Sequence, residues 1–134
     1  MIDKATREKI ISLIRREVVP ALGCTEPIAV SLAVAKATEL LGMQPEEINL
    51  GLSGNIIKNA MGVGIPGTGM IGLPIAIALG SLIGKSEYGL EVLKEVSPEA
   101  VDRGKAFIES VPINIKHLPD SPSTVSYTHL TLPT

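Results

Sequence analysis

Cys24 is the residue whose type and position point most directly to chemistry. It comes immediately before Thr25-Glu26-Pro27, where a hydroxyl side chain that can cap a helix, an acid and a proline indicate a helix N-terminus. Free amide protons and the positive partial charge at a helix N-terminus stabilise a thiolate, and a lowered pKa would let Cys24 act as a base, a nucleophile or an iron ligand. The competing interpretation is that Cys24 is a small, buried apolar residue in a turn.

A second group of polar residues lies where a predicted strand is followed by a short helix, at Ser53, Asn55, Lys58 and Asn59. Lys58 could bind a carboxylate, and the Ser and Asn side chains could orient an amino acid substrate. Residues of these types also cap nearby backbone in turns. Substrate binding and local capping are therefore both open interpretations of this group.

The glycine-rich loop GVGIPGTGMIG, residues 62–72, offers backbone amides without obstruction by side chains. The backbone at Gly67 and Gly69, together with the Thr68 hydroxyl, could surround a small anionic group such as a carboxylate. The loop contains two overlapping matches to a dinucleotide-binding fingerprint, but these matches are weak because a predicted helix, and not a strand, precedes the loop. The alternative role is a tight connection that lets two helices cross closely.

Composition and charge narrow the classes of partner. The chain has 134 residues, of which 45% are hydrophobic and 19% charged, with a formal net charge of −2. This balance gives no electrostatic reason to expect nucleic acid or an anionic membrane as a partner. The single cysteine excludes an internal disulfide and a metal site built from several cysteines of this chain. Without a signal-peptide pattern in the first thirty residues, we expect a cytoplasmic protein.

Apolar periodicity predicts an α+β fold that is mainly helical, with a small strand pair and the glycine-rich loop. Strict alternation of apolar residues at positions 48, 50 and 52 is typical of a half-buried strand. The uncharged stretch 59–84 is long enough for a membrane span, but Pro66, Pro74 and its glycines argue against one, so we expect no membrane partner. The predicted helices cover residues 3–18, 25–41, 55–61, 73–84, 86–96 and 97–110, and the predicted strands cover 48–52 and 113–117.

The C-terminal residues 125–134, VSYTHLTLPT, resemble the translation of a transposase-type sequencing adapter. Library scars are set aside before fold reasoning, so Tyr127 and His129 receive no functional weight. We therefore expect residues 1–124 to be the natural portion of the chain and residues 125–134 to be a non-native tail.

Three segments together resemble one family: EVVPALGCTEPIAVSLAVA at 17–35, SGNIIKNAMGVGIPGTGMIGLPIAIALG at 53–80 and YGLEVLKEV at 88–96. They are similar to L-cysteine desulfidases, which are related to the alpha portion of iron–sulfur L-serine dehydratases. The similarity keeps a continuous order of motifs to about residue 118. It implies that residues 1–124 are the N-terminal portion of such a domain, a truncated part of a larger one.

The resemblance implies a lyase that cleaves L-cysteine to hydrogen sulfide and 2-aminoacrylate, which decays to pyruvate and ammonia, with the help of a 4Fe–4S cluster. The cysteine of the family's GCTEP motif matches Cys24 and is implied as the base or as a residue close to the cluster. The expected cluster cysteines lie downstream, and this chain has none after Cys24. The 134-residue chain is therefore expected to be inactive by itself.

Two other functions stay open. The first is the same iron–sulfur chemistry on L-serine, an ammonia-lyase (dehydratase) reaction with water as the leaving group. The second is a non-catalytic ligand-binding module that keeps the loop but has no cluster. In each case the expected partner is a small amino acid, and the sequence leaves open whether the protein forms a homo-oligomer.

Overall fold

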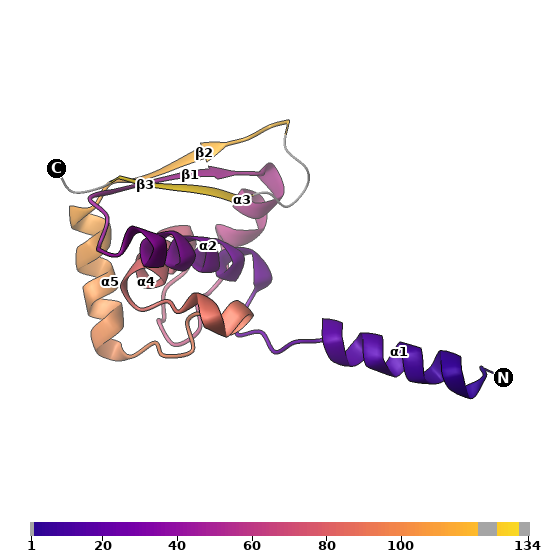
Figure 1. Ribbon diagram of the computed structural model, residues 1–134. Coiled ribbons are helices and arrows are strands. Elements are labelled where there is room, and N and C mark those ends of the chain that lie inside the picture. Colours follow the sequence, from indigo (N-terminus) through magenta and orange to yellow (C-terminus); the bar gives the residue numbers. More distant parts are fainter. Residues whose placement is uncertain (1, 121–125, 132–134) are drawn as a thin grey trace.

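The computed structural model describes residues 2–120 and 126–131 of the chain. The protein is α+β: helices pack against one face of a three-stranded sheet (Figure 1). Strand β1 (Glu47–Leu52) lies between the other two strands. It is parallel to β2 (Ile113–His117) and antiparallel to β3 (Ser126–Thr131).

Most of the helices agree with those that the sequence predicts. Helix α2 ends at Gly42, whose φ of 77° gives the left-handed C-cap that glycine adopts readily. Ser97 caps α5 by accepting a hydrogen bond from the Ala100 amide, as the Ser-Pro-Glu order predicts. The helices are α1 (Lys4–Glu17), α2 (Thr25–Leu41), α3 (Gly54–Ala60), α4 (Leu73–Leu82) and α5 (Pro98–Ser110), with a 3-10 helix η1 (Ser86–Glu91) before α5.

The predicted strand pair is confirmed, with Ile48 in register with Ile113. Ile48, Leu50 and Leu52 are 0–2% exposed and form a core with residues of α2, α4 and α5. Burial of a side chain of this size contributes about 1.5–3 kcal/mol, so this alternation anchors the sheet on the helices. Strand β3 was not predicted, because it lies in the segment 125–134 that resembles an adapter translation.

Helices α2 and α4 cross at very short range. The Ser31 hydroxyl lies 2.8 Å from the Ala76 carbonyl oxygen of α4 and 3.0 Å from the Pro27 carbonyl oxygen of its own helix. A Cβ atom at Gly80 would lie 2.6 Å from the Ser31 carbonyl oxygen, and one at Gly84 would lie 2.8 Å from the Ala35 side chain. Glycine is therefore required at position 80 because the backbone of α2 occupies the space of a side chain.

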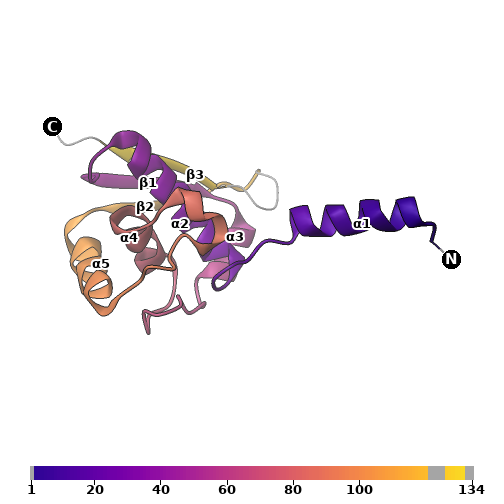
Figure 2. The same cartoon turned by 60° about the horizontal axis from the view of Figure 1, so that its bottom comes forward.

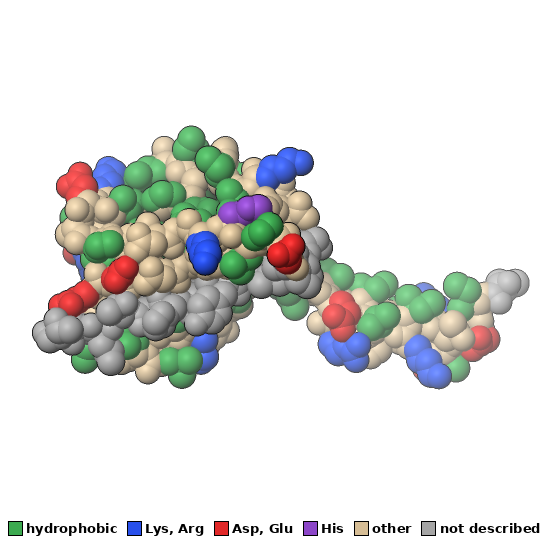
Figure 3. All heavy atoms as spheres, turned by 90° about the horizontal axis from the view of Figure 1, so that it is seen from above, with side chains coloured by type: hydrophobic (Ala, Val, Ile, Leu, Met, Phe, Trp, Pro, Cys, Tyr) green, Lys and Arg blue, Asp and Glu red, His purple; other side chains and the backbone are tan. Residues whose placement is uncertain are grey.

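Within the described part of the chain, no residue of α1 is buried against the rest of the protein. Asp3 caps the helix by accepting a hydrogen bond from the Thr6 amide, and the predicted amphipathic helix is confirmed. However, α1 projects away from the body in two views, and none of its residues is buried (Figures 1 and 2). In the view from above the sheet, the surface of helix α1 carries both hydrophobic and charged side chains (Figure 3). Leu13 and Ile14 remain about half exposed.

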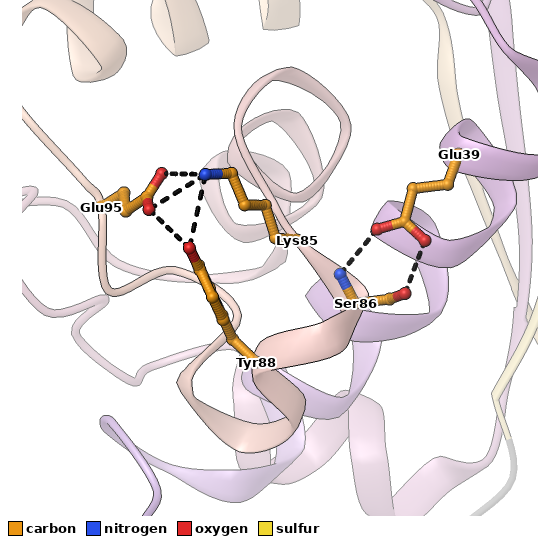
Figure 4. Close-up of polar contacts among 5 residues, drawn as sticks. All are labelled: Glu39, Lys85, Ser86, Tyr88 and Glu95. Carbon is orange, nitrogen blue, oxygen red and sulfur yellow. Dashed lines mark hydrogen bonds and ion pairs between the residues drawn. The ribbon is translucent and has the colours of Figure 1, made fainter.

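The helix predicted over residues 86–96 is confirmed only for its first half, and as a 3-10 helix. The 3-10 helix η1 ends at Glu91 and turns follow it, because Gly89 has φ 53° and ψ −125°, a conformation that interrupts a helix. Polar contacts hold this segment in place (Figure 4): Glu39 of α2 accepts hydrogen bonds from the amide and hydroxyl of Ser86, and Glu95 accepts from Lys85 and Tyr88. The ammonium group of Lys94 also lies 3.5 Å from the centre of the Tyr88 ring.

The uncharged stretch 59–84 does not form one long helix. It divides into the end of α3, the glycine-rich loop and the ten residues of α4. Within residues 2–120 and 126–131, every helix is too short or too polar to span a membrane.

We expect Gly80→Ala to lower the free energy of unfolding by about 1–3 kcal/mol, because the added methyl group would force α2 and α4 apart. The loss should occur although alanine is the better helix former. Urea denaturation followed by circular dichroism measures it.

Gly62→Ala is the matched control for this measurement. A Cβ atom there would meet no other atom within 4 Å among the described residues, and its φ is not positive. A change within about 0.5 kcal/mol is expected. Equal effects of the two substitutions would contradict the steric explanation.

Candidate functional site

The turn before α2 places Cys24 at the N-cap position. Cys24 has extended backbone angles, φ −73° and ψ 138°, and its side chain does not bond to the free amides of the helix. Thr25, predicted as the capping residue, is instead the first residue of α2. The Cys24 thiol is half-buried.

Glu26 connects the turn to α3. Its carboxylate accepts hydrogen bonds from the Cys24 thiol at 3.1 Å, from the Thr25 hydroxyl at 3.1 Å and from the Asn59 amide nitrogen at 3.0 Å. Asn59 lies 33 residues further along the chain, in the last turn of α3. Cys24 and Asn59, two residues of the predicted site, are thus brought together through a carboxylate that the prediction did not include.

The expected lowering of the Cys24 pKa is wrong. The hydrogen bond to Glu26 raises the pKa of the thiol, partial burial adds to this, and both outweigh the backbone amides at the helix start. The same hydrogen bond from Cys24, followed by those from its own backbone amide and Asn59, lowers the pKa of Glu26 to about 2. At neutral pH the site therefore holds an ionised carboxylate beside a protonated thiol.

The glycine-rich loop lies against this turn. A Cβ atom at Gly23 would come within 2.7 Å of the Pro66 ring, so the residue before Cys24 touches the loop directly. The predicted loop residues Gly67 and Gly69 have φ of 76° and 64°, which explains why glycine stands at both positions. The Thr68 hydroxyl donates to the Ile65 carbonyl at 2.7 Å and accepts from the Met70 amide at 2.9 Å, so it holds the loop closed.

The other predicted binding residues do not converge on Cys24. Ser53 is buried and caps α3 by accepting a hydrogen bond from the Ile56 amide, which matches the capping interpretation. Asn55 and Lys58 are exposed on α3, and Lys58 forms no ion pair within the described part of the chain. As substrate contacts, these three residues stay predictions.

Sequence reasoning missed two residues near the predicted positions. Glu26 was recognised only as an acid in the first helical turn, although its position two residues after Cys24 could have suggested a thiol–carboxylate pair. The His117 ring at the end of β2 lies against α3, where a Cβ atom at Gly54 would be 3.0 Å from its Nε2 atom. No local pattern could have indicated this contact, because it depends on the parallel pairing of β1 and β2.

The described residues do not fit a 4Fe–4S cluster. Such a cluster is held by several thiolates, and this chain has one cysteine. Within residues 2–120 and 126–131, His, Cys, Asp and Glu side chains do not gather in threes that could hold a metal ion. Thiolates for a cluster would have to come from outside these 134 residues, and Cys24 could supply one at most.

The chain is similar to proteins named UPF0597. It is 72% identical over 115 residues to a UPF0597 protein of Phocaeicola vulgatus and 68% identical over 105 residues to one of Bacteroides thetaiotaomicron. A third, from Aeromonas hydrophila, is 50% identical over 117 residues. These alignments cover 86%, 78% and 87% of this chain, and 27%, 24% and 27% of the respective relatives.

The chain therefore spans about a quarter of the length of the curated relatives that it matches. The name UPF0597 states no activity, substrate or cofactor, and so neither supports nor contradicts a lyase. No family model matches the chain. No solved structure matches it either.

We expect Glu26→Gln to lower the pKa of Cys24, because the change removes the carboxylate that accepts the thiol hydrogen and also its negative charge next to the thiol. The rate of alkylation by iodoacetamide as a function of pH measures this, since the thiolate is the reactive form. Glu8→Gln on the exposed helix α1 is the matched control. A profile that Glu26→Gln leaves unchanged would show that the carboxylate does not control the thiol.

We expect Asn59→Ala to raise the pKa of Glu26 above its value of about 2, because the carboxylate loses one donor. Ionised Glu26 favours the folded chain above the ordinary glutamate pKa of 4.5, and this contribution is lost as the pH falls towards 2. Carboxyl carbon NMR titration would follow the shift, with the exposed Asn55→Ala as control. An equal midpoint in both variants would contradict the contact.

Proposed function

We propose that this chain is the N-terminal portion of a lyase that cleaves L-cysteine to hydrogen sulfide and 2-aminoacrylate. The observation that carries the proposal is the convergence of Cys24, Glu26 and Asn59 beside the glycine-rich loop. The three segments that resemble L-cysteine desulfidases include all three residues and the whole loop. The resemblance and the geometry thus select the same place in the molecule.

The reaction requires two changes at the substrate. A base removes the proton from Cα, and the Cβ–sulfur bond breaks so that its electron pair leaves with the sulfur, which takes up a proton. The products are 2-aminoacrylate and hydrogen sulfide. Part of this reaction needs only protein side chains. One group must accept hydrogen bonds from the substrate's ammonium group, and another must take up the Cα proton.

Glu26 suits the ammonium group, because it is ionised at neutral pH and already accepts N–H and S–H donors. An ammonium group at Glu26 would compete with the thiol for the carboxylate and offset its negative charge, and the hydrogen bond and the charge both raise the pKa of Cys24. The thiol could then lose its proton more easily and act as the base. In this proposal, substrate binding itself prepares Cys24 for proton transfer.

The cluster implied by the resemblance would need thiolates from the three quarters of the relatives' length that this chain does not span. We therefore assign no step of the reaction to it here. In the same proposal the 134-residue chain alone is inactive, and the whole protein works in the cytoplasm on a free amino acid.

The test is a chimera in which residues 1–118 of this chain replace the matching segment of the Phocaeicola vulgatus relative. We expect anaerobic release of sulfide and pyruvate from L-cysteine. Cys24→Ser should lower kcat by about 10²–10⁴, the range typical of general acid–base groups, with the cluster absorption unchanged. Glu26→Gln should raise KM, because it removes the acceptor of the ammonium group.

Glu8→Gln in the same chimera is the control and should leave both constants unchanged. Higher kcat/KM for pyruvate from L-serine than for sulfide from L-cysteine would overturn the substrate assignment. Turnover of neither amino acid by a folded chimera containing its cluster would overturn the lyase and favour a binding module.

A further inference from the structure

Strand β1 has the character of an interior strand. Its residues Ile48, Leu50 and Leu52 are almost fully buried, and Gly51 is buried as well. The sequence EINLGL contains no proline and no lysine, the residues that commonly protect a free sheet edge from unwanted pairing. A strand of this kind needs hydrogen-bonding partners on both sides.

Strand β2 has the opposite character. Pro112 precedes it, Lys116 lies within it and Pro119 follows shortly after it. These residues are typical of a natural sheet edge. The two sides of β1 therefore differ: β2 closes the sheet on one side, and the other side requires a further strand.

In this chain the further strand is β3, which pairs antiparallel along the whole of β1. Its residues 126–131 lie in the segment that resembles an adapter translation. By register, Ser126 and Thr128 stand opposite Leu52 and Leu50. Leu130 stands opposite Ile48, but polar residue types stand in β3 opposite the two buried leucines, where a strand evolved for this position would carry apolar ones.

We propose that the side of β1 away from β2 is the acceptor edge for a strand from the downstream part of the full-length protein, and that β3 takes its place here. The relatives are long enough to contain such a strand, because this chain spans only about a quarter of their length. The occupant is an extended segment of about six residues, matching the six of β1, with apolar residues opposite Ile48, Leu50 and Leu52. This inference is independent of the lyase assignment.

The decisive experiment is a crystal structure of the full-length Phocaeicola vulgatus relative. The expected result is that a strand from beyond the aligned region is hydrogen-bonded to the counterpart of β1, on the side away from the counterpart of β2. An open edge, an edge covered by a helix or loop, or a strand from a second copy would each overturn the proposal.

Proline substitutions test the pairing in this chain. In Tyr127→Pro/His129→Pro, alternate β1 amides that face β3 should exchange with solvent at least tenfold faster. Amides that face β2 should keep their protection and so show that the chain is folded. Thr134→Pro, outside the strand, is the control. Unchanged exchange of all β1 amides in the double variant would overturn the stand-in role of β3.

Discussion

The close contact between α2 and α4 at Ser31 and Gly80 determines where the candidate site can lie. The backbones approach so closely that a methyl group at position 80 would overlap the Ser31 carbonyl. With α2 fixed in this way on α4, the start of α2 faces the loop that leads into α4. The contact between Gly23 and Pro66 follows from this arrangement, and it places Cys24 beside the glycine-rich loop.

The site itself depends on a competition between two electrostatic effects. The free amides at the start of α2 favour a thiolate, whereas the Glu26 carboxylate favours a protonated thiol. The carboxylate dominates because its hydrogen bond from the thiol, together with partial burial, outweighs the opposing effect of the backbone amides of Thr25 and Glu26. In the proposed function, an ammonium group bound at Glu26 would oppose the effect of the carboxylate on the thiol.

Much of the fold could be predicted from local patterns. Three elements could be recognised from their own residues alone. These are β1 from its apolar alternation, the end of α2 from the αL glycine at position 42, and the start of α5 from the Ser97 cap. The break at Gly89 was missed because a glycine inside an apolar helical pattern does not by itself reveal a positive φ. Strand β3 was missed because its segment resembles an adapter translation and no strand was predicted there.

Less of the candidate site could be predicted from the sequence. Cys24 and the loop could be selected from residue type and resemblance, and the structure places them together. The sign of the pKa change of Cys24 depends on the orientation of the Glu26 side chain, and that orientation is supported by Asn59 from another helix. Ser53, Asn55 and Lys58 lie near each other in the sequence, yet a short helix spreads them over its length and surface.

In the proposed function, an ammonium group at Glu26 releases Cys24 from its protonated state. The most direct test is the pKa of Cys24 in the chimera, measured by alkylation with and without a saturating unreactive amino acid such as L-alanine. We expect a lower pKa when the amino acid is bound. An unchanged or higher pKa, with binding demonstrated by calorimetry, would contradict it.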